Sequence, residues 1–111
     1  MEAASTIYVS VVSIYEIDFK RRRGGRRAED SFLQRMPRNM PDALPSFGLK
    51  LVDVTAEIAW RAARLPIDHP DPWDRILVSQ AMALNAPLIS NDRPLRASVD
   101  SQAKTRGVIV F

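Results

Sequence analysis

The first part of the chain carries two apolar patterns in succession. Residues 6–10 are rich in β-branched and aromatic side chains, which predicts a short buried strand. Residues 11–22 follow as a predicted helix, and Gly24 and Gly25 are expected to end it because glycine is a poor helix former. The pattern therefore begins with a strand that leads directly into a helix.

A second helix is predicted over residues 27–36, and it ends before Pro37 because proline cannot continue a helix. Proline, asparagine and aspartate are frequent over residues 37–48. This composition predicts a connection that holds one short helical turn around residues 42–44.

The second half of the chain repeats the alternation. Residues 49–54 predict a strand, Thr55 a helix N-cap, and residues 56–65 a helix that Pro66 ends. Residues 72–84 predict a longer helix, because apolar side chains recur there at three- and four-residue spacings. These side chains are Trp73, Ile76, Leu77, Ala81 and Leu84.

Two short apolar runs, residues 88–90 and 108–111, are predicted to be strands, and the link over residues 93–105 is expected to be irregular or helical. Strands that alternate with helices predict an α/β fold whose mostly parallel sheet is covered on both faces. With 111 residues, the chain is expected to form a single domain over residues 1–111.

Composition narrows the chemistry. The chain has no cysteine, which excludes disulfides, thiolate metal sites and thiol nucleophiles and suits a reducing compartment, so a cytoplasmic location is expected. No apolar run approaches the ~20 residues that a membrane span needs. The net charge is +3, with cations concentrated over residues 20–27, and this distribution favours a polyanionic partner.

Two aspartates stand at neighbouring element ends. Asp74 falls in the first turn of the helix predicted over residues 72–84, and Asp92 follows the strand predicted over residues 88–90. Ligands of an open α/β sheet gather beyond the carboxyl ends of its strands, so the two carboxylates are expected to converge. Converging carboxylates in a chain without cysteine favour a hard metal ion.

Three blocks of the sequence resemble the PIN-domain nucleases, and most closely the VapC-type toxins of bacterial toxin–antitoxin pairs. Residues 7–17 resemble the family's strand followed by a helix with an acidic residue. Residues 65–81 contain the motif HPDPWDR, and residues 87–92 read PLISND. The resemblance covers most of the chain and implies a PIN-like three-layer α/β/α fold.

The same resemblance implies a site. In active family members, acidic residues at the positions of Glu16, Asp74 and Asp92 hold Mg²⁺ or Mn²⁺ for RNA cleavage, so these three are expected to be both catalytic and metal-binding. Supporting roles are expected for Ser10, Asp71 and Ser90.

One family position is not matched. The family opens with an apolar strand that ends in an Asp, and residues 1–6 supply neither. Relative to the family, the chain is therefore expected to be truncated at its N-terminus, to lack the first strand of the sheet, and to leave a gap in that sheet.

The acidic residues also have structural interpretations. Asp71 precedes Pro72 and is favoured as a helix N-cap, and Asp74 would return a hydrogen bond to the cap backbone. Asp92 is typical of a turn. Asp18 lies two positions from Glu16 and faces another direction, so it is expected to pair with the arginine four positions on.

The cations and aromatic residues leave two alternatives open. Arg21, Arg22 and Arg23 are predicted either to contact RNA phosphates or to form a solvated helix end that favours the helix dipole. His69, the only histidine, is expected to be a surface residue without a catalytic role. The two tryptophans, at positions 60 and 73, are expected in the core or at a dimer interface rather than as platforms for bases.

By resemblance, the chain is expected to be a Mg²⁺-dependent endoribonuclease, the toxin of a type II toxin–antitoxin system, acting on RNA as a homodimer under the restraint of a cognate antitoxin. The alternative is a catalytically inactive PIN-like remnant or an interaction module that binds antitoxin or RNA, which the unmatched first Asp favours. A third hypothesis is a fragment that another chain completes.

Overall fold

The computed structural model describes residues 6–23 and 34–110, and the chain divides into two compact units, Met1–Asp53 and Val54–Phe111. Each unit combines helices with a pair of short parallel strands, which agrees with the mixed α/β class and the PIN-like fold expected from the sequence. Most of the helix predicted over residues 27–36, its preceding glycines and residue 111 lie outside the described residues.

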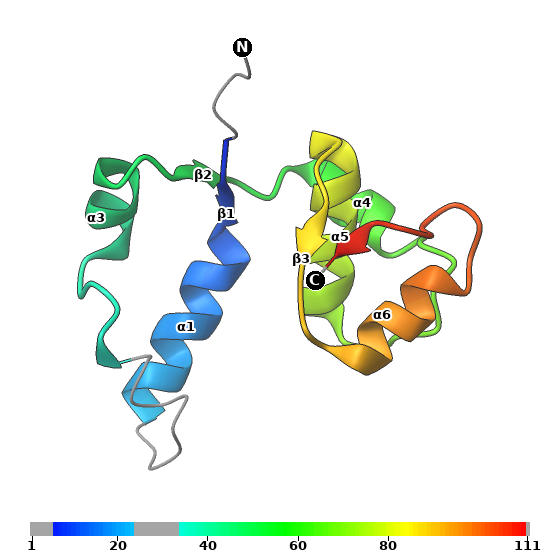
Figure 1. Cartoon of the computed structure of the whole chain (residues 1–111), viewed down its shortest axis with the longest axis horizontal. Coiled ribbons are helices and arrows are strands. Elements are labelled where there is room, and N and C mark those ends of the chain that lie inside the picture. The colour runs from blue at the N-terminus through cyan, green and yellow to red at the C-terminus, as the bar shows by residue number, and fades with distance from the viewer. Residues whose placement is uncertain (1–5, 24–33, 111) are drawn as a thin grey trace. The chain divides into compact units, whose positions relative to one another are not determined.

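The first unit is built on strand β1 (Tyr8–Ser10), which pairs in parallel with strand β2 (Lys50–Val52). β1 leads without a break into helix α1 (Val11–Arg23), as predicted. The side chain of Ser10 is buried at the strand–helix junction. Its Oγ accepts a hydrogen bond from the backbone N–H of Val12 at 3.1 Å. Figure 1 shows α1 continuing from the end of β1.

The predicted helical turn around residues 42–44 is a complete short helix, α3 (Met40–Ser46). Asn39 caps it, because its side chain accepts a hydrogen bond from the backbone N–H of Asp42, and α3 packs on β2. Its buried side chains Met40 and Leu44 contribute, with Val12 of α1, the apolar interior of this unit.

The second unit contains helices α4 (Ala56–Ala62), α5 (Pro72–Leu84) and α6 (Arg93–Asp100). Strands β3 (Leu88–Ile89) and β4 (Ile109–Val110) pair in parallel. The hydrophobic core of this unit is formed by side chains of the loop before α5, of α5, of α6 and of β4. It consists of Ile67, Val78, Leu95, Val99 and Ile109.

Local signals set most of these bounds. Thr55 caps α4 and Asp71 caps α5, both as predicted, and α5 covers the predicted residues 72–84. Asn85 ends α5 in the left-handed conformation, with φ of 51°, which asparagine tolerates better than most residues. The predicted link over residues 93–105 contains a regular helix, α6, because Asp92 caps it.

The tryptophans correct part of the prediction. Trp60 of α4 is 61% exposed and Trp73 of α5 is 43% exposed, so neither belongs to the core. Val78, which the predicted apolar stripe of α5 omits, is fully buried instead. A side chain in the first turn of a helix can point past the packed face, and the helical period alone does not show this.

Buried hydroxyl groups hold the second unit together. The Oγ of Ser79 donates to the carbonyl of Ile58 at 2.8 Å and joins α5 to α4, the pair of helices that contact one another most extensively. The Oγ1 of Thr105 donates to the carbonyl of Val99 at 2.7 Å at the end of α6.

Within residues 6–23 and 34–110, every helix is too short or too polar to cross a bilayer.

Candidate functional site

Asp71 is the N-cap of α5. Its Oδ1 accepts hydrogen bonds from the backbone N–H groups of Trp73, at 2.9 Å, and Asp74, at 3.4 Å, and Pro72 occupies the first turn. These bonds satisfy N–H groups that have no partner within the helix. The structural interpretation of Asp71 as a helix N-cap is confirmed. The cap fixes the first turn of α5, to which Asp74 belongs.

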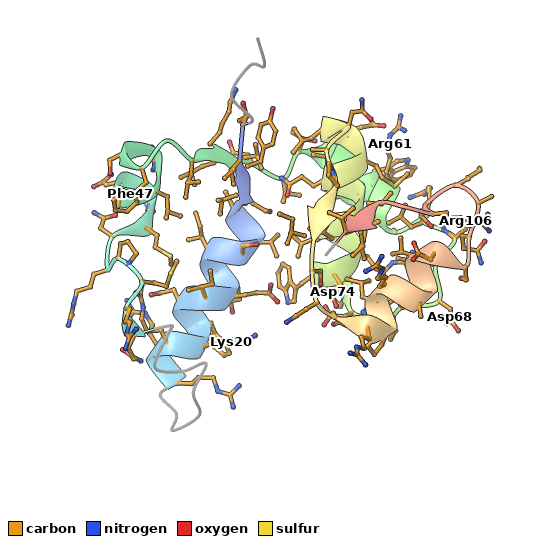
Figure 2. All side chains as sticks on the ribbon, in the orientation of Figure 1. Lys20, Phe47, Arg61, Asp68, Asp74 and Arg106 are labelled. Carbon is orange, nitrogen blue, oxygen red and sulfur yellow. The ribbon has the colours of Figure 1, made fainter. Side chains whose placement is uncertain are left out.

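Asp74 makes a contact that the sequence did not predict. Its Oδ2 lies 2.8 Å from Nε2 of His69, and the two side chains are only 20% and 14% exposed. His69 is therefore not the surface residue expected from its place in a loop beside proline. In a hydrogen bond to an ionised carboxylate, the imidazole N–H is the donor. The bond orients the carboxylate and leaves its Oδ1 outside this contact. Figure 2 marks Asp74 near the start of α5.

Arg75, the next residue, organises the loop that carries His69. Its guanidinium donates to five backbone carbonyls between the end of α4 and the start of α5, over distances of 2.8–3.3 Å. The five acceptors are the carbonyls of Ala62, Ala63, Leu65, Ile67 and His69. Because the backbone of His69 is one of them, Arg75 also sets the position from which His69 reaches Asp74.

Asp92 joins β3 to α6. Its Oδ1 accepts a hydrogen bond from the backbone N–H of Leu95 at 3.0 Å, and the Oγ of Ser90 accepts one from the backbone N–H of Asp92 at 3.1 Å. The structural interpretation of Asp92 as a turn residue is confirmed, and Ser90 supplies the hydroxyl group of this turn. The cap uses one carboxylate oxygen, so Oδ2 lies outside this bond.

The order of the elements places Asp74 and Asp92 at the same end of the second unit. α5 is followed by a turn of three residues and then by β3, which contacts α5. The chain reverses in that turn, so the start of α5 lies toward the carboxyl end of β3 (Figure 1). That end is where parallel α/β sheets bind ligands.

Glu16 belongs to the first unit, in the second turn of α1, and it follows the carboxyl end of β1. Glu16 and Asp92 thus follow the carboxyl ends of β1 and β3 along the chain. Asp74, at the start of α5, lies toward the carboxyl end of β3. Among residues 6–23 and 34–110, no three His, Asp or Glu side chains gather into one metal-binding group.

Asp74 and Asp92 of the second unit are side chains of the type that hard divalent cations take as ligands. Each carboxylate has one oxygen used in an orienting hydrogen bond. Mg²⁺ keeps several water ligands and is often bound through only one or two carboxylates. Carboxylates that ligate a metal are usually themselves hydrogen-bonded, as both of these are.

The three arginines at the end of α1 make different contacts. Arg21, with a side chain only 11% exposed, donates to the carbonyls of Met36 and Pro37, and it also pairs with Asp18. Arg22 pairs with Asp18 at 2.8 Å, which confirms the pairing predicted at the i,i+4 spacing. The guanidinium of Arg23 lies over the ring of Phe19. Arg21 thus holds the unit together, and Arg22 and Arg23 remain exposed.

Hydrogen bonds from Arg22 and then Arg21 hold the pKa of Asp18 below its ordinary value, and the bond to Asp18 raises the pKa of Arg22. The ionised carboxylate is therefore favoured in the folded chain. The resulting stabilisation is present above the ordinary pKa of an aspartate and is lost as the pH falls through the lowered value.

A family model described as PIN domain matches residues 1–98, which is most of the chain. The chain belongs to the PIN domain family. No curated protein and no solved structure shows a match. PIN domains generally use divalent metal ions and act on RNA or DNA, so membership indicates a nuclease-type function for this PIN domain. The acidic residues described above are the natural candidates for its site.

Proposed function

We propose that this PIN domain is a Mg²⁺- or Mn²⁺-dependent endoribonuclease and the toxin of a type II toxin–antitoxin pair. The observation that carries the proposal is the pair of oriented carboxylates at one end of the second unit. Asp74 is held by His69, and Asp92 is held by its own helix cap. The matched motif and the family support a phosphodiester as the substrate.

Asp74 and Asp92 would hold the cation directly, and Glu16 keeps the role that the resemblance to the family gives its position, that of a ligand directly or through water. A divalent cation, when bound, lowers the pKa of water and neutralises charge on the phosphate under attack. The chain's own contribution is to orient each carboxylate through a hydrogen bond, Asp74 through His69 and Asp92 through the backbone of α6. Asp71 contributes by fixing the first turn of α5, and Ser10 and Ser90 fix the strand–helix turns that precede Glu16 and Asp92.

The first test of the proposal is removal and return of the metal. The purified chain is incubated with a labelled total-RNA pool in Mg²⁺, in Mn²⁺, and in EDTA. We expect cleavage in the first two conditions, none in EDTA, and recovery when Mg²⁺ exceeds the chelator. Cleavage that persists in EDTA would show that the activity does not use the proposed site.

The alternative is a PIN-like module that binds RNA or an antitoxin without cutting. A folded chain that binds RNA but cuts none of the pool in either metal would establish this alternative.

A single domain over residues 1–111 and a homodimer are also part of the proposal. Light scattering after size exclusion measures whether the chain is a dimer.

His69 is expected to act as a positioning residue for Asp74. Replacing it by phenylalanine removes the hydrogen bond to Oδ2 but keeps a planar ring. We expect the Mg²⁺ concentration for half-maximal cleavage to rise about tenfold or more, the range seen when partners of metal ligands are removed. His69→Gln, which keeps an N–H donor, is expected to recover part of the loss. Equal metal dependence in the wild type and His69→Phe would contradict this role.

A further inference from the structure

We infer that α1 of the first unit carries a binding site for unpaired nucleotides of single-stranded RNA, built on the stacked rings of Tyr15 and Phe19. The inference rests on the proposed function for the nature of the polymer. It assigns to α1 a role in holding the strand that is separate from the acidic site.

The two rings form a regular stack. Their centroids lie 5.7 Å apart with an angle of only 14° between the planes, because the residues are four positions apart on one helix. The guanidinium of Arg23, four positions further along, lies 5.7 Å from the centroid of Phe19 and continues the series. Tyr15 is 54% exposed and Phe19 is 47% exposed, so the stack lies open at the surface of its unit.

A hollow of about 500 Å³ lies beside the stack, within the same unit. Tyr15, Phe19, Met40 and Pro41 supply apolar surface to it, and Arg38 supplies a guanidinium group. Arg22 also lines the hollow, together with its ion-pair partner Asp18. This volume falls in the range of sites that bind small molecules, so it accommodates a nucleotide. The hollow therefore offers a flat apolar surface for a base next to the exposed guanidinium of Arg38 for a phosphate.

The charge around the rings favours a nucleic acid over a protein. The sequence of α1 holds four cations and two carboxylates, and its last turn consists entirely of cations, Lys20 to Arg23. The centre of a protein–protein interface is normally depleted of charged residues, lysine above all. Aromatic rings combined with a basic surface are typical of proteins that bind single strands, in which bases stack on the rings and the backbone lies along the cations.

The test measures binding apart from cleavage. A fluorescein-labelled oligouridylate of twelve nucleotides is titrated with the full chain in EDTA, and the anisotropy gives Kd. We expect Tyr15→Ala with Phe19→Ala to weaken binding at least tenfold, since stacking on an aromatic ring contributes about 1–3 kcal/mol per base. Phe47→Ala is the matched control, because Phe47 is an exposed aromatic residue of the same unit that lies outside the stack and the hollow (Figure 2). The control is expected to bind as the wild type does.

A second variant tests the cations. Arg38→Gln keeps both rings and is expected to reduce the dependence of binding on salt, because one phosphate contact is lost. Circular dichroism confirms that each variant is folded.

Unchanged affinity in Tyr15→Ala with Phe19→Ala overturns the inference. Absence of binding by the wild type overturns it too, as does a change in oligomeric state without a change in affinity, which assigns the rings to a protein interface. If binding behaves as expected but Mg²⁺ and Mn²⁺ produce no cleavage, the proposed function fails and the binding site stands.

Discussion

Asp74→Asn and Asp92→Asn are each expected to lower metal-dependent RNA cleavage about 100-fold or more. Each change removes a negative charge from the proposed cation site while keeping the size of the side chain, so the cation binds less tightly and water is activated less. Asparagine is as good an N-cap as aspartate, so Asp92→Asn retains the start of α6. Initial rates of RNA cleavage at saturating and at limiting Mg²⁺ measure the effect.

Asp68→Asn is the matched control for both variants. Asp68 is an exposed carboxylate in the loop before α5, marked in Figure 2, and its loss changes the net charge by the same amount. We expect its cleavage rate to stay within about twofold of the wild-type rate, because a single exposed charge has only a small electrostatic effect. An equal loss in all three variants would show that net charge, and not a cation site at Asp74 and Asp92, determines the rate.

Arg75→Gln is expected to lower the free energy of unfolding by about 3 kcal/mol or more. The guanidinium serves five carbonyls of the segment from Ala62 to His69, and a shorter neutral side chain reaches few of them. Each buried acceptor left without a donor costs on the order of 1–3 kcal/mol, and the partial exposure of the segment and relaxation around it reduce the sum. Urea denaturation followed by circular dichroism measures the change.

Arg106→Gln serves as the control for this prediction. Arg106 is exposed and its Nε donates to one carbonyl, that of Asp100, at 3.1 Å (Figure 2). Its replacement is expected to cost less than about 1 kcal/mol. Arg75→Lys is expected to remain well below the wild type, because one ammonium group cannot reproduce the geometry of the guanidinium. Wild-type stability of Arg75→Gln would mean that the clamp contributes nothing to the fold.

Local features were readable from the sequence. The bounds of α5 and the caps at Thr55 and Asp71 depend on a residue and its near neighbours. The same holds for the ion pair of Asp18 with Arg22, one helical turn apart. Periodicity, capping and turn preferences describe such short-range relations, which is why these predictions held.

The relations that make the site could not be read in this way. His69 meets Asp74 only because the loop is held by Arg75, and the five acceptors of Arg75 belong to a backbone conformation that no residue type specifies. The exposure of Trp60 likewise depends on how α4 packs, and its apolar character suggested the opposite. Conversely, the stack of Tyr15 on Phe19 lies at a spacing that the sequence does show, and the overlooked signal was two aromatic residues four positions apart next to a basic turn.

The most direct test of the central claim is a titration of the chain with Mn²⁺, in which electron paramagnetic resonance measures the free ion. The account predicts binding by the wild type and by Asp68→Asn, and a loss of affinity of tenfold or more in Asp74→Asn and in Asp92→Asn, with all variants folded by circular dichroism. Binding that is unchanged in Asp74→Asn and Asp92→Asn would contradict it, because the cation would then be held elsewhere.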